Sequence, residues 1–322
     1  MAGRVRKALI EATVGSLAVG LVHAAKRLDR SRTANFAGAL MRKVGPLFKE
    51  HRLGRDNLRA AFPEKSDAEI EKILGGVWDN LGRIAIEFAH LDEFSVEGWG
   101  EPTPDFITYP PESKTRFERI MKTGKATIGF AAHLANWELP AVGAKLLGVR
   151  SALLYRRPNI AAVNDVIVKL RRPLMGELIP TGLDAPVKLA RLLQAGVHVG
   201  MLADQHYTRG VEVTFFGRPC LANPLIAMLA RQTELPIYGM RVVRKPDGNS
   251  FWGEVSDPVE PVRDADGRID VRGTTQAITA VIEDWIRQHP EQWLWLHRRW
   301  RPEDLIVPRQ GEKVSRRDWA AS

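Results

Sequence analysis

The sequence has few of the residues that mark several protein classes. Its 322 residues include one cysteine, Cys220, so no internal disulfide can form and no zinc site can be built from cysteines. Beyond the N-terminal segment, no apolar run is long enough to cross a bilayer. The 27 glycines and 20 prolines are scattered without a period, which excludes a collagen-like or low-complexity chain. What remains is a globular protein, because 44% of the residues are hydrophobic and can form a large core.

Positive charge exceeds negative charge. The chain has 47 lysines and arginines against 38 acidic residues, which gives a formal net charge of +9. This excess indicates an anionic partner such as nucleic acid, an acidic membrane surface or an acidic carrier protein. Nine tryptophans against four tyrosines are also unusual. Tryptophan favours positions that are partly apolar and partly wet, such as a membrane interface.

The N-terminal segment 8–25 is the best candidate for membrane contact. Basic residues precede and follow it, and its larger apolar residues form one helical stripe: Ile10, Val14, Leu17, Leu21 and Leu28. Glu11 and His23 argue against a helix that spans the membrane. We therefore expect residues 1–30 to form an amphipathic anchor on an anionic leaflet. A helix packed on the protein's own core is the alternative, and a cleaved signal peptide fits less well.

The rest of the chain divides into two regions with different patterns. Residues 31–110 are predicted to be helical, and a capping box at Ser66–Glu69 opens a helix with 3.6-residue apolar spacing to Phe88. Residues 111–305 alternate short apolar runs with helical segments, which predicts an α/β core with a largely parallel sheet. We expect strands at 126–132, 151–155, 197–202, 237–243 and 251–255, and helices at 116–122, 137–147, 160–170, 186–194, 225–233 and 274–288. Residues 306–322 form a C-terminal tail.

The segment 131–138 carries the residues best suited to catalysis. A buried strand runs into a polar turn and then into a helix, and sites in α/β folds lie at the carboxyl ends of strands. His133 falls in this turn, and if Asn136 caps the helix, the carboxylate of Glu138 can reach back to the imidazole. A histidine oriented by a carboxylate acts as a general base on a substrate hydroxyl. The alternative is a core histidine, with Glu138 as a charge near the helix dipole.

Two other strand ends carry charged residues. Arg156 and Arg157 follow the strand 151–155, and paired guanidiniums suit phosphate recognition, although solvated surface arginines are the alternative. Asp204 follows the strand 197–202 and could orient an arginine, bind a substrate group or only form a turn. The sequence lacks a nucleophile elbow and a glycine-rich phosphate loop, which argues against an acyl-enzyme and a nucleotide cofactor.

A basic patch at 297–299 is interleaved with the tryptophans at 293, 295 and 300. These residues could stack on nucleic acid bases, but a partly buried tryptophan cluster, with basic groups that bind an anionic lipid or structural carboxylates, fits better. His133, Glu138, Asp204 and His206 could bind a hard metal ion on paper, yet nothing in their spacing requires one.

Taken together, several segments match one family in order along the chain. Residues 133–138 match its His-x4-Glu/Asp motif, residues 155–159 its arginine-bearing strand end, and residues 290–299 its C-terminal signature Pro-Glu-Gln-Trp-Leu-Trp followed by His-Arg-Arg. Further matches lie at 57–64, 80–83 and 204–219. Over residues 40–302 the chain thus resembles the lipid A biosynthesis acyltransferases, the lauroyl and myristoyl transferases. It departs from their pattern at Ala222-Asn223-Pro224, where a turn with Thr and Gly is expected.

The resemblance implies an α/β, glycerol-phosphate-acyltransferase-like layered fold. The implied activity is O-acyl transfer from acyl carrier protein to a hydroxyl of a 3-hydroxyacyl chain on a phosphorylated, Kdo-bearing lipid A precursor, at the cytoplasmic face of the inner membrane. It implies no metal or cofactor, and no nucleic acid partner. The implied catalytic residues are His133 and Glu138, and Arg156, Asp204 and Arg298 would bind substrate. Backbone amides after His133, or an arginine, would stabilise the tetrahedral oxyanion.

Three alternatives to this function remain open at this point. The acceptor could be another lipid, such as a phosphatidylinositol mannoside or a lysophospholipid. The histidine could activate water instead, which would make the protein a lipid hydrolase. The chain could also be a basic lipid- or nucleic-acid-binding protein without catalysis.

Overall fold

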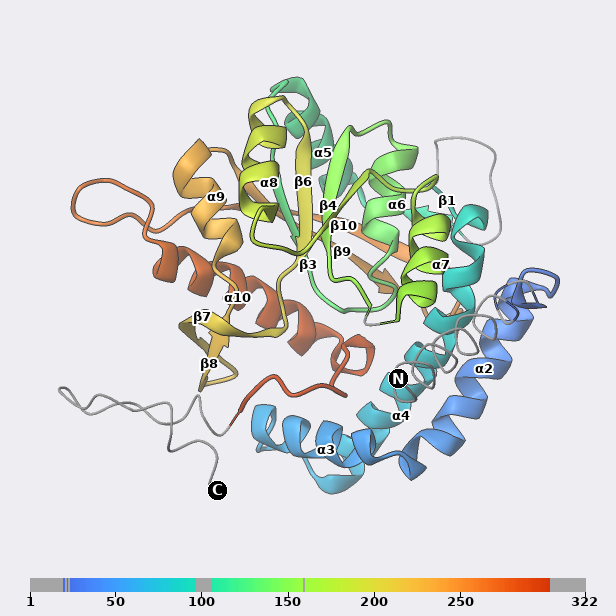
Figure 1. Cartoon of the computed structure of the whole chain (residues 1–322). Coiled ribbons are helices and arrows are strands. Elements are labelled where there is room, and N and C mark those ends of the chain that lie inside the picture. The colour runs from blue at the N-terminus through green and yellow to red at the C-terminus, as the bar shows by residue number, and fades with distance from the viewer. Residues whose placement is uncertain (1–19, 21, 23, 97–105, 159, 302–322) are drawn as a thin grey trace, which may run out of the picture.

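A central eight-stranded sheet organises the chain (Figure 1). The computed structural model describes residues 20, 22, 24–96, 106–158 and 160–301. The strand order is β1 (Ser95–Val96), β2 (Phe106–Thr108), β10 (Phe251–Val259), β9 (Ile237–Arg244), β3 (Ile128–Ala131), β6 (His198–Leu202), β4 (Ser151–Tyr155) and β5 (Glu177–Pro180). Strands β9, β3, β6, β4 and β5 are parallel, and only the β9–β10 pair is antiparallel within this sheet. The predicted α/β class with a largely parallel sheet is confirmed.

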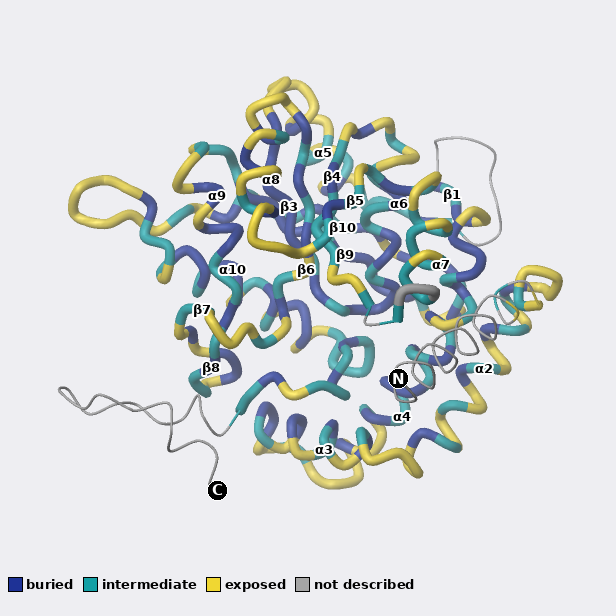
Figure 2. Tube along the Cα trace, in the orientation of Figure 1, coloured by how far each residue is buried: buried dark blue, intermediate teal, exposed yellow. Residues whose placement is uncertain are grey.

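Helices cover both faces of this sheet. In Figure 1, α8 (Ala185–Gln194), α9 (Leu225–Thr233) and α10 (Val271–Gln288) lie on one side, and α6 (Leu139–Leu146) and α7 (Ala161–Arg171) lie on the other. Helix α5 (Pro111–Lys122) packs on β10. Because helices cover both faces, the central strands are buried (Figure 2), which is why β3 reads as a continuous apolar run and β9 is apolar apart from the buried Arg241 and Arg244.

The N-terminal region is helical, as expected. It consists of α2 (Arg30–Val44), the 3-10 segments η1 (Gly45–Leu47) and η2 (Phe88–Glu93), α3 (Lys49–Ala61) and α4 (Asp67–Glu87). The capping box predicted for α4 is present, since the Ser66 side chain accepts from the Glu69 amide and the Glu69 carboxylate accepts from the Ser66 amide. Gly82 lets α4 approach α2 closely, because a Cβ there would lie 2.5 Å from the Ala37 carbonyl oxygen.

Two features of the structure differ from the prediction. The region 31–110 is not wholly helical, because β1 and β2 lie in it and extend the main sheet. A second, antiparallel sheet of β7 (His206–Phe215) and β8 (Arg218–Ala222) was also not expected. Its two-residue turn places Phe216 at φ 52° and Gly217 at φ 69°. The positive φ of Phe216 is strained for a bulky residue. Its ring makes edge-to-face contacts with the rings of Phe62 and Phe215, at centroid distances of 5.2 Å and 4.8 Å.

The predicted N-terminal stripe lies outside the described residues, except for the exposed Leu28. The predicted tail, 306–322, lies outside them too. Within the described part of the chain, no helix has both the length and the apolar character needed to cross a membrane.

Candidate active site

The turn after β3 and the turn after β6 meet at one edge of the sheet. Strands β3 and β6 are neighbours, and Ala131 pairs with Leu202. His133 and Asp204 each follow their strand by two residues, so the register brings them side by side. The imidazole Nδ1 of His133 lies 2.9 Å from Oδ1 of Asp204, and the His133 backbone amide donates to Oδ2 at 2.8 Å. The indole Nε1 of Trp293 donates to the same Oδ2 at 2.7 Å.

The charge on Asp204 fixes which imidazole nitrogen can act as a base. The carboxyl group is buried, which by itself raises its pKa, but the charge and hydrogen bond of His133 lower the pKa well below its usual value. The ionised carboxylate accepts the Nδ1 proton of His133, so Nε2 carries the free lone pair. Nε2 faces the more exposed side, where its lone pair accepts a hydrogen bond from the Gln205 side-chain amide at 3.2 Å, and a substrate hydroxyl would take the place of that amide. His133 is thus oriented as a general base whose reactive nitrogen is open to substrate.

Glu138 has a different partner from the one predicted. Its carboxylate is buried and accepts from Nε of Arg171 at 2.8 Å and from Nη2 of the same guanidinium. The predicted hydrogen bond between Glu138 and His133 is not formed, because Asp204 approaches Nδ1 from the neighbouring strand and Gln205 faces Nε2. The expected cap is not formed, because α6 begins at Leu139 with Glu138 as its N-cap residue; Asn136 Oδ1 instead accepts from the Glu138 amide at 3.2 Å in the turn before the helix. A catalytic role for Glu138 stays a prediction, with Arg171 as a neighbour that the spacing could not reveal.

A buried polar network fixes the His133 turn from behind. The Asn136 side chain donates to Oε2 of Glu87 at 2.8 Å, and Glu87 pairs with Arg244 of β9. Asn80, also on α4, donates to the Ala135 carbonyl at 3.2 Å. Since the members of this network are buried and mutually hydrogen-bonded, it holds the turn in one conformation.

The C-terminal signature lies directly against this turn. Leu134 and Trp293 form a β-bridge, and the Leu294 amide donates to the His133 carbonyl at 3.0 Å. Trp293 and Trp295 are fully buried, which confirms the expectation that these tryptophans belong partly to the core. The His297 ring centroid lies 6.4 Å from that of His133 and 5.3 Å from that of Trp293. The segment therefore supplies both core and site.

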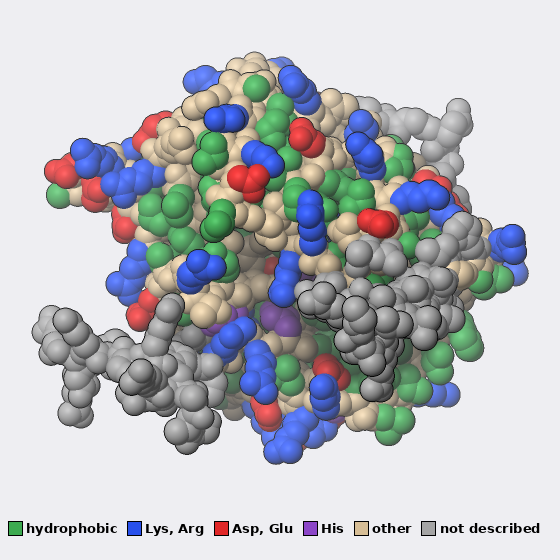
Figure 3. Space-filling view, in the orientation of Figure 1, with side chains coloured by type: hydrophobic (Ala, Val, Ile, Leu, Met, Phe, Trp, Pro, Cys, Tyr) green, Lys and Arg blue, Asp and Glu red, His purple; other side chains and the backbone are tan. Residues whose placement is uncertain are grey.

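The structure places Asp204 and the predicted substrate-binding arginines in different surroundings. The Asp204 carboxylate already accepts hydrogen bonds from the His133 ring, the His133 amide and the Trp293 indole. This favours a role in orienting His133 over the substrate contact predicted from the sequence. Arg156 follows β4, the neighbour of β6, and is exposed at the same edge as His133. Arg298 is exposed as well, whereas its neighbour Arg299 is buried and donates to the Leu221 carbonyl at 3.0 Å. Figure 3 shows histidine side chains in a hollow of the surface, with lysine and arginine side chains around it.

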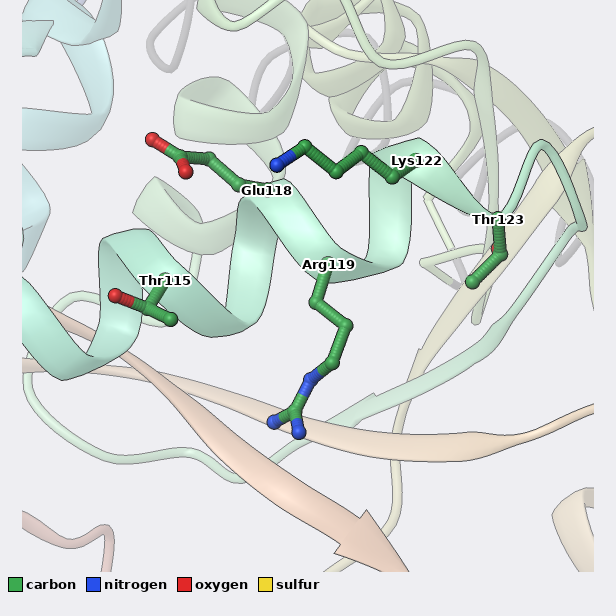
Figure 4. A pocket seen from close by; sticks show the side chains of 5 residues that line it. All are labelled: Thr115, Glu118, Arg119, Lys122 and Thr123. Carbon is green, nitrogen blue, oxygen red and sulfur yellow. The ribbon is translucent and has the colours of Figure 1, made fainter.

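A depression elsewhere on the surface has no histidine in its lining. It is lined by Thr115, Glu118, Arg119, Lys122 and Thr123 of α5 and its C-terminus (Figure 4). Helix α5 ends before β3 begins, whereas His133 follows the end of β3. We therefore do not assign the reaction to this depression. Among the described residues, no three His, Cys, Asp or Glu side chains are grouped as metal ligands.

Comparison with known families connects this geometry to an activity. The family model of bacterial lipid A biosynthesis acyltransferases matches residues 4–302. The chain belongs to this family. The match spans the His133 turn, Asp204 and the C-terminal signature, so the resemblance seen in the sequence is confirmed. None of the curated proteins compared with the chain matches it significantly.

Proposed function

We propose that the protein transfers a fatty acyl chain from acyl carrier protein to the hydroxyl of a 3-hydroxyacyl chain on a Kdo-bearing lipid A precursor. The observation that carries this proposal is the His133–Asp204 pair, in which an ionised carboxylate leaves Nε2 free to accept a proton. Family membership supports lipid A as the class of acceptor.

The proposed reaction is a direct transfer. Nε2 of His133 takes the proton of the acceptor hydroxyl while Asp204 stabilises the resulting imidazolium. The hydroxyl oxygen forms a bond to the thioester carbonyl carbon, and the carbonyl electrons move to oxygen as an oxyanion. When the oxyanion collapses, the C–S bond breaks, and the carrier thiolate takes the proton back from His133. No acyl-enzyme is needed.

One assay separates this function from its alternatives. The full chain is incubated with labelled acyl-acyl carrier protein and a tetra-acylated lipid A precursor. Label in the precursor supports the proposal, and label released as free fatty acid indicates a hydrolase. Transfer only to a lysophospholipid or a phosphatidylinositol mannoside, tested in parallel, indicates another acceptor. Absence of any turnover indicates a lipid-binding protein.

Arg156 is the proposed contact for an acceptor phosphate. It is exposed at the edge that holds His133, and a guanidinium binds phosphate through paired hydrogen bonds. Arg156→Ala should raise the KM for the acceptor by roughly tenfold and change the KM for acyl carrier protein little, since a charge-assisted hydrogen bond contributes about 1.5–3 kcal/mol. Arg191→Ala is the matched control, because Arg191 is also exposed but lies on α8, which ends before β6 begins. Equal losses with both substrates would show a structural role for Arg156.

We also propose that the protein acts at the cytoplasmic face of the inner membrane as a peripheral protein. Support comes from an exposed apolar ridge on α2 and the segment after it, formed by Phe36, Leu40, Leu47 and Phe48. Phe36 and Leu40 are one helical turn apart, and the exposed Arg32 and Lys43 continue the same row. An apolar row with basic neighbours fits the surface of an anionic bilayer. The N-terminal anchor predicted from the sequence would precede this ridge.

The ridge can be tested with vesicles that contain phosphatidylglycerol. Burying one large apolar side chain contributes about 1.5–3 kcal/mol. The double variant Phe36→Asp/Leu47→Asp should therefore bind vesicles at least about tenfold more weakly. Its activity should fall further on bilayer-embedded acceptor than on acceptor in detergent. Met121→Asp/Leu146→Asp is the matched control. Both side chains are exposed, and they lie at the ends of α5 and α6, before β3 and β4 begin. A lower melting temperature with unchanged vesicle binding would show that the ridge packs within the protein.

A further inference from the structure

A second histidine in the site has unused hydrogen-bonding capacity. Both ring nitrogens of His297 are buried, and neither makes a hydrogen bond of good geometry, although the backbone of Leu294 lies close enough to the ring to raise its pKa. Buried polar side-chain atoms are normally paired, so an unpaired ring beside the general base needs a reason. The backbone around it is fixed, since the Asn57 side chain donates to the carbonyls of Trp295 and His297, both at 2.8 Å. The ring is thus held beside His133 with a donor and an acceptor unused.

The charge state of His297 decides which chemistry it can perform. Burial lowers its pKa to about 4, the charge of His133 also lowers the pKa, and Asp204 and the backbone of Leu294 oppose this shift. At neutral pH the ring is therefore uncharged, with one N–H donor and one acceptor nitrogen. When His133 takes a proton, its positive charge favours the neutral form of His297 even more. His297 does not compete for the proton but can donate a hydrogen bond.

The proposed reaction needs a donor at this position. The attack on the thioester produces an oxyanion, which requires preorganised N–H groups. The sequence suggested backbone amides after His133, or an arginine, for this role, but the first two of those amides are already used: the Leu134 amide donates to the Ala132 carbonyl at 2.7 Å and the Ala135 amide to the Gln292 carbonyl at 2.8 Å. The unpaired ring of His297 supplies a donor that these amides do not.

We propose that His297 is a second catalytic residue, whose ring N–H donates a hydrogen bond to the oxyanion formed on the thioester carbonyl. This inference rests on the proposed acyl transfer. The hydroxyl proton moves to His133, the new C–O bond places the electron pair on the carbonyl oxygen, and His297 binds that oxygen. Breakage of the C–S bond then restores the carbonyl and releases the hydrogen bond.

The test compares two substitutions of similar size. His297→Gln keeps an N–H donor in the site, whereas His297→Leu keeps only the volume. The leucine variant should lower kcat by about a hundredfold or more, as removal of an oxyanion donor does elsewhere, and change the KM of either substrate by less than about threefold. The glutamine variant should retain at least about tenfold more activity than the leucine variant. Melting temperatures near that of the unaltered chain should accompany both variants.

The rate is followed as release of the carrier protein thiol, which occurs whether the acyl group goes to lipid or to water. The fate of the acyl group then tests the proposed function, while the ratio of the variants tests His297. Near-normal release by the leucine variant would overturn the role of His297. Equal losses by the leucine and glutamine variants would also overturn it, as would losses that follow a lower melting temperature. An unaltered chain that releases no thiol overturns both proposals.

Discussion

Replacing His133 by alanine should lower the turnover of acyl transfer by roughly a hundredfold or more while the chain keeps its fold. The substitution removes the only imidazole nitrogen that is both oriented by Asp204 and open to substrate among the described residues. The Asp204 carboxylate keeps the Trp293 indole and the backbone amide of residue 133 as donors, so the melting temperature should fall only moderately. Steady-state kinetics with labelled donor, together with thermal unfolding, measure both effects.

A matched variant separates the general base from the rest of the site. His206 opens β7 two residues after Asp204, and its replacement leaves the His133–Asp204 hydrogen bond in place, so His206→Ala should leave kcat within a few-fold of the unaltered value. Comparable losses at both histidines, or near-normal turnover by the His133 variant, would contradict the assignment of His133 as the base.

Local patterns in the sequence predict the helices and strands that bury one apolar face. Strand β4 (Ser151–Tyr155) and helix α9 (Leu225–Thr233) match their predicted bounds, because apolar periodicity and flanking turns define them. Strands β1 and β2 have two and three residues, too few to show a period. Strand β7 shows apolar alternation only over residues 211–215, because its first half is polar and largely exposed, and its pairing depends on the hairpin turn at Phe216 and Gly217.

The site is less predictable because its contacts are not local. The turn position of His133 follows from the strand that precedes it, but its hydrogen-bond partner Asp204 lies 71 residues away and is set by the register of β3 and β6. Glu138 lies close in sequence, yet a cation on another helix, Arg171, takes its carboxylate. Spacing can place residues at one edge of a sheet, but it cannot assign their partners.

The positive charge of the chain also has more than one use. Arg244 pairs with the buried Glu87 and holds the catalytic turn through Asn136, and Arg299 is buried against a backbone carbonyl. These arginines stabilise the fold, and their removal would leave an unpaired buried partner. Arg156, by contrast, is exposed at the sheet edge, and we propose that it attracts the anionic substrate.

Asp204→Asn should lower kcat by about 10³–10⁴-fold, with little change in KM. An amide at this position can donate to Nδ1 of His133, which would place the imidazole proton on Nε2 and remove the base. Glu138→Gln is the informative comparison, since Glu138 was the carboxylate predicted to orient His133. If Asp204 is the orienting group, only its replacement should cause this loss, and a larger loss from Glu138→Gln would restore the prediction made from the sequence.

The Asp204→Asn variant should also differ from the unaltered chain in how its free energy of unfolding depends on pH. The pKa of Asp204 is lowered in the folded chain, so the unfolded chain binds its proton at a higher pH, about 3.9. The carboxylate therefore stabilises the fold above about pH 4, and this contribution is lost as the pH falls further towards the lowered pKa. Unfolding of both chains by denaturant between pH 7 and pH 3 measures the effect. The unaltered chain should be more stable near neutral pH, and its advantage over the Asp204→Asn variant should shrink below about pH 4. A stability difference that stays constant across this range would show that the charge on Asp204 does not stabilise the folded site.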